Sequence, residues 1–243
     1  MLSKAKIKFV KSLQIKKYRK QEQLFVVEGA KSVTELLNSS FEVVLLIGVP
    51  QFLQSLDLPP DIETINASVA ELEQIGSFQS NDTILAVARM KPNEPVTINQ
   101  HDFALVLDDI RDPGNLGTII RTADWFGIRK VIASEESADF YNPKVIAASM
   151  GSFTRVSAYY TPLPAYLSTA KSKVFGTYLD GEDVHNTKFE GGGFLLIGNE
   201  SRGVSKDLDA FVTHRITIPR FGGGESLNAA VATAIICDNI RKG

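Results

Sequence analysis

The sequence predicts an α/β protein of two domains, and three observations support this fold class. Runs of continuous apolar residues alternate with segments of helical spacing, which is typical of a parallel sheet covered on both faces. The chain has 243 residues, and one domain commonly takes about 100 to 200. A polar stretch with two prolines, residues 91–100, interrupts the pattern and separates a domain of residues 1–95 from one of residues 100–243.

The first domain is predicted to be a small α/β unit. Residues 31–37 have the spacing of an amphipathic helix. Ser68 and Glu71 have the spacing of a capping box, so a second helix is expected to start there. Strands are predicted at residues 24–27, 43–47 and 83–88.

The second domain is predicted to hold the parallel sheet. It begins with a fully apolar strand at residues 103–107, and a helix follows from about Asn115 to Phe126. The chain then alternates between strands and helices until a last helix that continues to about Arg241. Ligands of parallel sheets lie beyond the carboxyl ends of the strands, so we expect chemistry in the loops that follow strands. The further strands are predicted at residues 130–133, 174–178, 194–197 and 215–218.

Composition argues against several classes of protein. The longest apolar runs fall far short of the roughly 18 to 20 residues that a membrane-spanning helix needs. The basic N-terminus is not followed by the apolar core of a secretory signal, so a cytoplasmic protein is expected. The single cysteine, Cys237, and three scattered histidines form no ligand cluster in the sequence, so no metal is expected.

Positive charge is concentrated at the start of the chain. Residues 1–31 carry nine basic and two acidic side chains, whereas the whole chain has a net charge of -2. Such a segment favours a polyanion, with nucleic acid as the natural candidate, because each neutralised phosphate releases counterions. A solvated amphipathic helix that packs Ile7, Val10 and Leu13 on the core explains the charge equally well. The candidate RNA-binding residues are Lys16, Lys17, Arg19 and Lys20.

Three loops that follow strands carry polar residues in suggestive positions. Asn115 lies at the expected start of a helix, and Arg121 lies off its apolar stripe. Glu200 follows the strand at residues 194–197, and Gly198 there would allow a ligand close to the backbone. Ser226 follows three glycines, but the loop lacks the spacings of nucleotide-phosphate motifs. Each loop alone could be an ordinary turn with solvated polar residues.

In combination and in order, the three loops resemble the signature motifs of the SpoU (TrmH-type) branch of the SPOUT RNA methyltransferases. The motifs are the D-P-x-N-x-G-x-x-x-R-T-A run at residues 112–123, the G-N-E-x-x-G turn at residues 198–203 and the I-P…E-S-L-N-x-x-x-A run at residues 218–232. The resemblance covers residues 103–243. More loosely, residues 13–29 look like the ribosomal-protein-like, RNA substrate-binding domain of many such enzymes.

The resemblance implies a fold, a cofactor and a reaction. The family has a parallel sheet with a C-terminal trefoil knot, works as a homodimer, and uses S-adenosylmethionine to methylate a ribose 2′-hydroxyl in rRNA or tRNA. The additional first domain favours rRNA. By the family motifs, the cofactor-binding residues would be Ile197, Gly198, Ile218, Pro219 and Leu227, and the active-site residues would be Asn115, Arg121, Glu200, Ser226 and Asn228.

Chemistry restricts two of these roles. A guanidinium stays protonated in proteins, so Arg121 is expected to bind a phosphate or stabilise an alkoxide, with Glu200 orienting it. Ser226 could either take part in the reaction or cap the last helix.

Two other functions compete with methyl transfer. A non-catalytic RNA-binding protein with a degenerate cofactor site would not need the four polar residues together. A dinucleotide-dependent oxidoreductase would need a glycine fingerprint that the sequence lacks.

Overall fold

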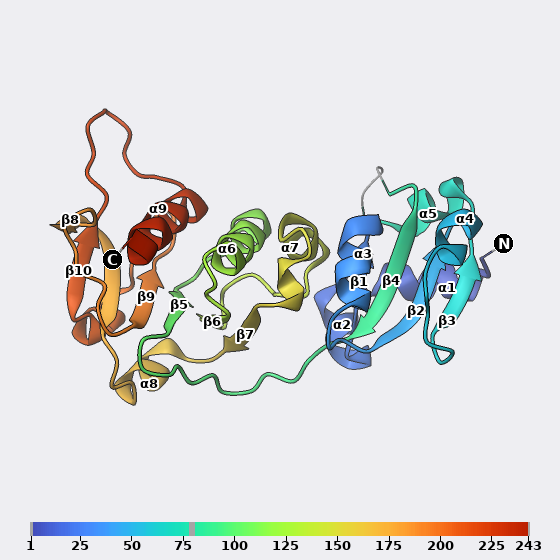
Figure 1. Ribbon diagram of the computed structural model, residues 1–243, viewed down its shortest axis with the longest axis horizontal. Coiled ribbons are helices and arrows are strands. Elements are labelled where there is room, and N and C mark those ends of the chain that lie inside the picture. The colour runs from blue at the N-terminus through green and yellow to red at the C-terminus, as the bar shows by residue number, and fades with distance from the viewer. Residues whose placement is uncertain (1, 78–80, 243) are drawn as a thin grey trace. The chain divides into compact units, whose positions relative to one another are not determined.

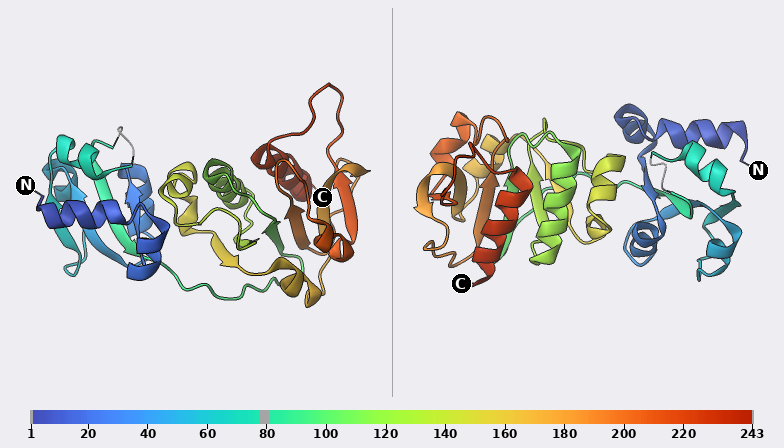
Figure 2. Two further views of the ribbon diagram at one scale, coloured as in Figure 1. Left: turned by 180° about the vertical axis from the view of Figure 1, so that it is seen from behind. Right: turned by 90° about the horizontal axis from the view of Figure 1, so that it is seen from above.

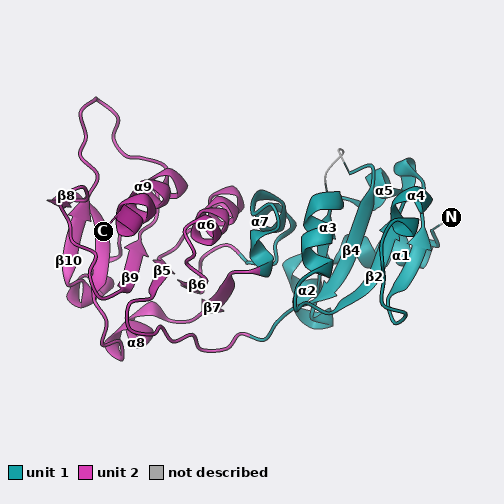
Figure 3. Ribbon diagram, viewed as in Figure 1, with its two compact units in different colours: residues 1–92, 139–154 teal, residues 93–138, 155–243 magenta. Residues whose placement is uncertain are grey.

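The computed structural model describes residues 2–77 and 81–242. The chain divides into two compact units (Figure 3). Unit 1 comprises residues 1–92 and 139–154, and unit 2 comprises residues 93–138 and 155–243. Unit 1 therefore contains a segment from the middle of the chain that sequence patterns did not assign to it.

Unit 1 contains a four-stranded sheet in the order β1-β4-β2-β3 (Figure 1). Strands β2 and β3 pair in parallel, whereas the β1–β4 and β2–β4 pairs are antiparallel. The three predicted strands are confirmed, whereas β3 was missed because most of its side chains are exposed and show no apolar pattern. The elements are α1 (Lys4–Ser12), α2 (Lys16–Glu22), β1 (Leu24–Glu28), α3 (Ala30–Leu37), β2 (Val43–Gly48), α4 (Pro50–Gln54), β3 (Glu63–Asn66), α5 (Val69–Ile75), β4 (Ile84–Arg89), α7 (Pro143–Ala148) and η1 (Ser152–Thr154).

Helices α1 and α5 cover one face of this sheet. Val10 and Leu13 are fully buried in one apolar cluster with Leu72 and Ile75, and Ile7 packs at its edge. The interpretation of the basic segment as an amphipathic helix that packs on the core is thus confirmed for α1. The capping box at Ser68 and Glu71 is also confirmed, since each side chain accepts a backbone N–H of the other residue.

Aromatic side chains explain why residues 139–154 belong to unit 1. Phe25 on β1 contacts the rings of Phe41, Tyr141 and Phe153, with centroids 4.7 to 6.0 Å apart. Burial raises the pKa of the Tyr141 hydroxyl to about 12. The segment contributes apolar area that β1 would otherwise expose to water.

Unit 2 contains a six-stranded sheet in the order β10-β8-β9-β5-β6-β7, and every strand pair is parallel, as predicted. The order reverses between β5 and β9, and such a reversal opens a crevice at the carboxyl ends of the two strands. The elements are β5 (Phe103–Leu107), α6 (Pro113–Trp125), β6 (Lys130–Ala133), β7 (Ser157–Tyr160), α8 (Leu163–Ser168), β8 (Val174–Asp183), β9 (Gly193–Ile197), η2 (Lys206–Phe211), β10 (His214–Thr217) and α9 (Ala229–Lys242).

Helices cover both faces of the unit 2 sheet. Helices α6 and α9 lie side by side on one face (Figures 1 and 2). On the other face, Leu163 of α8 and Leu208 of η2 pack against Ala104 and Val106 of β5. Within the described residues, no helix combines the length and apolarity needed to cross a bilayer.

Candidate active site

Three of the predicted active-site residues meet in one hydrogen-bonded cluster. Asn115 Nδ2 donates to Glu200 Oε1 at 2.6 Å, and Asn228 Nδ2 donates to Asn115 Oδ1 at 2.8 Å. Asn115 is 85 residues from Glu200 and 113 from Asn228 in sequence. Asn115 and Glu200 follow β5 and β9, the two strands at the reversal of strand order, so the cluster lies where a parallel sheet binds its ligands. We call it the polar cluster.

The start of α6 leaves the Asn115 side chain free to enter the cluster. The helix begins at Pro113, two residues earlier than predicted, and Asp112 is its N-cap. The Asp112 carboxylate accepts the backbone N–H of Asn115 at 2.8 Å. Asn115 is therefore inside the first turn, and its amide does not have to cap the helix.

The start of α9 fixes Asn228. Asn228 Oδ1 accepts the backbone N–H groups of Ala230 and Val231 at 2.9 and 3.3 Å, so Asn228 is the N-cap. The suggestion that Ser226 caps this helix is wrong, because Ser226 precedes the cap by two residues. Its side chain is exposed and forms no hydrogen bond within the described part of the chain.

A tight turn after β9 presents Glu200. Asn199 and Gly203 exchange two backbone hydrogen bonds of 3.0 and 2.8 Å. A Cβ on Gly198 would lie 2.2 Å from the carbonyl carbon of Gly203, so the turn itself requires glycine there. The backbone of Gly203 and Val204 fills the space on that side of Gly198, and the expected approach of a ligand to the Gly198 backbone stays a prediction.

Two parallel helices orient the polar cluster. Their first turns are joined by Asn228 and Asn115, and their last turns by Arg241 Nε, which donates to Phe126 O at 2.6 Å. The N-terminal ends of both helices are thus linked to the Glu200 carboxylate through the two asparagines. The hydrogen bonds all donate in the same direction: the α9 backbone donates to Asn228, Asn228 to Asn115, and Asn115 to Glu200 Oε1. Glu200 Oε2 has no hydrogen bond among the described residues and can accept one from a substrate.

Arg121 does not join the polar cluster. Arg121 is six positions after Asn115, and at 3.6 residues per turn their side chains point about 120° apart around α6. Arg121 is exposed and has no hydrogen bond or ion pair within the described residues. Glu200 therefore orients Asn115 and not Arg121, contrary to our expectation. Arg121 shares the exposed stripe of α6 with Thr118 and Trp125, whose exposure is 84%.

The predicted cofactor-binding residues fall into two groups. Ile197 is buried in the sheet, whereas Ile218 and Pro219 are half-buried and Leu227 is 49% exposed. The latter three residues lie in the segment that joins β10 to α9, where Leu227 directly precedes Asn228, and they leave apolar surface uncovered. A flat, partly apolar group such as an adenosine fits this chemistry, because apolar contact is what these side chains offer.

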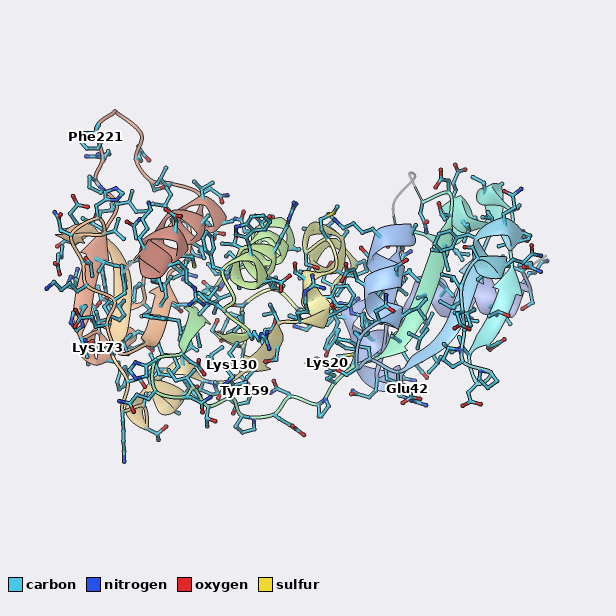
Figure 4. The ribbon with its side chains drawn as sticks, viewed as in Figure 1. Lys20, Glu42, Lys130, Tyr159, Lys173 and Phe221 are labelled. Atoms are coloured by element: carbon cyan, nitrogen blue, oxygen red, sulfur yellow. The ribbon has the colours of Figure 1, made fainter. Side chains whose placement is uncertain are left out.

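The loop between Pro219 and Leu227 is open. Phe221 is 98% exposed and lies on the extended part of this loop (Figure 4). A Cβ on Gly222, Gly223 or Gly224 would meet no other described atom within 4 Å. Packing in this conformation therefore does not require glycine at these positions, and their backbone freedom allows the loop to rearrange.

A separate cavity of about 330 Å³ lies beside the polar cluster. Sequence reasoning missed it, although Asp108, Asp109 and Arg111 directly follow a predicted strand. None of the residues predicted for the cofactor or for the reaction is among the residues that line it. The cavity is lined by Asp108, Asp109, Arg111, Ser134, Glu135, Glu136, Pro162, Leu163, Pro164, Arg202, Ser205, Asp207 and Leu208.

The structure divides the four predicted RNA-binding residues of unit 1. Lys16, Lys17 and Lys20 on α2 are exposed (Lys20 is labelled in Figure 4). Arg19 is only 1% exposed: it donates to Asp139 Oδ2 and to the carbonyls of Leu13 and Gln14. The prediction for Arg19 is therefore wrong, because a buried guanidinium with these partners cannot neutralise a phosphate. The charge pattern could not distinguish it from its neighbours.

Metal-ligand geometry is not found in the part of the chain that the structure describes, where no group of three or more His, Cys, Asp or Glu residues could hold an ion. The polar cluster offers one carboxylate and two amides instead. It is thus suited to bind and orient a hydroxyl.

Known protein families match both parts of the chain. The model of the SpoU rRNA Methylase family matches residues 102–238, and that of the MRM3-like substrate binding domain matches residues 4–86. The chain is 31% identical over 240 residues to the 23S rRNA (guanosine(2553)-2'-O)-methyltransferase RlmP of Bacillus subtilis, covering 97% of this chain and 96% of the relative.

Two solved structures cover the whole chain. A putative RNA methyltransferase of the TrmH family from Porphyromonas gingivalis has 38% identity and a TM-score of 0.89, with 100% of both chains covered. An AdoMet-bound rRNA methyltransferase from Sinorhizobium meliloti has 26% identity and a TM-score of 0.91, with 100% of this chain and 96% of the other covered.

Proposed function

Because this chain belongs to the SpoU rRNA methylase family, we propose that it transfers a methyl group from S-adenosylmethionine to a ribose 2′-hydroxyl of ribosomal RNA. The observation that carries the proposal is the polar cluster, which unites Asn115, Glu200 and Asn228 from the three family motifs. The presence of all three disfavours a non-catalytic protein with a degenerate site. The 23S rRNA relative favours rRNA over tRNA.

The cofactor supplies a methyl group that is already activated on a sulfonium, so the protein has to align the ribose and assist loss of its proton. Glu200 Oε2 accepts the hydrogen bond of the 2′-hydroxyl and takes its proton as the oxygen attacks. Asn115 holds Oε1 and so fixes the direction of Oε2. Asn228 in turn fixes Asn115, and no metal is needed.

Other predicted residues support this arrangement. Ile218, Pro219 and Leu227 provide uncovered apolar surface for the cofactor, and the backbone at Ile197 and Gly198 is assigned to the same ligand. Arg121, exposed and without a partner in the described chain, binds the phosphate next to the methylated ribose. Ser226, which is exposed in the segment that joins β10 to α9, is assigned to ribose binding.

We further propose that the protein acts as a cytoplasmic homodimer whose catalytic unit carries the trefoil knot of its family. Trp125 and Val231 support the dimer, because they leave apolar side chains exposed on α6 and α9. Light scattering of the Trp125→Asp variant tests it: a dimeric parent and a monomeric variant are expected. A monomeric parent would contradict the dimer.

The reaction is tested with purified protein, methyl-labelled S-adenosylmethionine and rRNA from a source strain that lacks the gene. Nuclease digestion and mass spectrometry should find the label in one 2′-O-methylnucleoside. The matched pair is Glu200→Gln, expected to be inactive, and Glu190→Gln, an exposed control on another loop. A label on a base, or no label in any RNA, would contradict the proposal.

A further inference from the structure

We propose that the cavity beside the polar cluster binds the base of the methylated nucleotide and that its carboxylates select guanine. The inference rests on the proposed function and identifies the base that accompanies the ribose. The polar cluster and the cavity have one wall in common. The turn at residues 199–203 directs Glu200 to Asn115 and Arg202 to Asp109, so one short loop borders both the polar cluster and the cavity.

The cavity lining contains a carboxylate oxygen that accepts no hydrogen bond from the described residues. Asp108 is only 5% exposed and lines the cavity. The backbone N–H and the hydroxyl of Ser205 both donate to its Oδ2, each at 2.7 Å. Asp108 Oδ1 has no hydrogen bond within the described residues. Among the described residues, the buried side-chain atoms without a partner are Glu28 Oε2 and Asn81 Nδ2, so Asp108 Oδ1 is not enclosed by protein and can accept a hydrogen bond from a ligand in the cavity.

Two arginines in the cavity lining share one carboxylate. Arg111 Nε donates to Asp109 Oδ1 at 2.6 Å, and Arg202 pairs with Asp109 Oδ2. One carboxylate therefore fixes two guanidinium groups, and both side chains remain largely exposed to the cavity or solvent. Guanidinium planes stack on unpaired bases in many RNA-binding sites.

The charge of the lining excludes an anion and favours a ligand rich in donors. Five carboxylates and two guanidiniums line the cavity, and Asp109 already neutralises part of the arginine charge. A phosphate would face an excess of negative charge. Since no metal-ligand group was found among the described residues, a neutral ligand with N–H groups fits best.

Among the four RNA bases, guanine offers the best match to such a lining. Its Watson–Crick edge presents N1–H and the N2 amino group side by side, and a carboxylate can accept both. Adenine and cytosine present one amino group next to an acceptor nitrogen. Uracil presents one N–H between two carbonyl oxygens, which would face Asp108 and the rim residues Glu135 and Glu136.

The test compares RNA fragments that differ only at the methylated nucleotide. After that nucleotide is mapped in rRNA, kcat/KM is measured on fragments that carry guanosine, inosine, adenosine or uridine there. We expect guanosine to be preferred by about tenfold to inosine, which lacks the N2 amino group; this ratio corresponds to about 1.4 kcal/mol.

Variants of the cavity connect that preference to Asp108. Asp108→Asn keeps an acceptor for Ser205 but replaces Oδ1 by a donor, so it should abolish the guanosine preference and raise the relative rate on uridine. Glu136→Gln, on the exposed rim, should reduce the preference without affecting the fold. Glu190→Gln, which does not line the cavity, should leave it unchanged. Loss of folding alone would lower the rates on all four fragments equally.

The outcomes separate this inference from the proposed function. A methylated uridine, or a guanosine preference that survives both Asp108→Asn and Glu136→Gln, would overturn the cavity assignment while methyl transfer stands. Absence of transfer to any RNA would overturn the proposed function and this inference together. A methylated guanosine whose preference depends on Asp108 supports both.

Discussion

Replacement of Arg19 by methionine should destabilise unit 1 severely, although the residue lies in a segment that reads as surface. Methionine keeps most of the apolar stem but removes every hydrogen bond of the guanidinium. Asp139, which is 13% exposed, then keeps its charge without a cation, and the carbonyls of Leu13 and Gln14 lose a donor. Loss of one partner of a buried pair costs about 3 to 5 kcal/mol.

The free energy of unfolding should be measured with a probe inside unit 1. The single tryptophan, Trp125, lies in unit 2, so its fluorescence reports on the wrong unit. Hydrogen exchange of the β1 and β4 amides reports directly on the stability of unit 1. A loss of about 3 to 5 kcal/mol in the free energy of unfolding should lower the protection of these amides by roughly 10²- to 10⁴-fold. Lys20→Met is the control, because it removes an exposed charge one position away.

A double variant separates the lost pair from the orphaned charge. Asp139→Asn in the Arg19→Met background removes the unpaired carboxylate, so the double variant should be more stable than Arg19→Met alone. If Arg19→Met changed protection no more than Lys20→Met does, the guanidinium would be hydrated in solution. A structural role for Arg19 would then be wrong, and RNA binding would again be open to it.

Four further predictions follow from the site and the core. Glu200→Gln should lower kcat by at least about 10²-fold, as expected for loss of a proton acceptor, with the calorimetric Kd for S-adenosylmethionine unchanged; an altered Kd with normal kcat would assign Glu200 to the cofactor. Joint replacement of Lys16, Lys17 and Lys20 by alanine should weaken the salt dependence of RNA binding. The slope of log K against log salt concentration should become shallower by roughly 0.7 to 0.9 for each phosphate that is no longer neutralised, whereas Lys171→Ala in unit 2 should leave the slope unchanged. Burial raises the pKa of the Cys237 thiol to about 12, so iodoacetamide should label it at pH 8 only after denaturation, and rapid labelling of the native protein would show that α9 opens. Hydrogen bonds from the Ser68 and Leu2 backbones lower the pKa of Glu71 from 4.5 to about 2, so its stabilising effect should be complete above pH 4.5 and be lost as the pH falls towards 2; Glu71→Gln should remove that acid-dependent part of the unfolding curve, and an unchanged curve would contradict the capping argument.

Periodicity predicted the buried strands well because burial on both faces leaves a continuous apolar run. Phe103–Leu107 on β5 is such a run, and the parallel sheet followed from several of them. Edge strands carry less of this signal. Ser157–Tyr160 on β7 pairs on one side only and none of its side chains is fully buried, so its pattern resembled a loop.

Prediction of the site depended on the motifs and not on periodicity. The motifs supplied Asn115, Glu200 and Asn228, but they could not show that these side chains bond to one another while Arg121 points elsewhere. Helical phase separates Asn115 from Arg121, and this could have been worked out from their spacing of six. The burial of Arg19 could not, because its partner Asp139 is 120 residues away in sequence.

The link between Asn228 and Asn115 also has a consequence for synthesis on the ribosome. At roughly 5 to 20 residues per second, about 6 to 23 s pass between translation of one asparagine and of the other, 113 residues later. Throughout that interval the nascent chain presents α6 without its neighbouring helix, and Glu200 emerges before the amide that completes its support. Catalytic competence is thus acquired late in translation, well after the sheet strand β5 has been made.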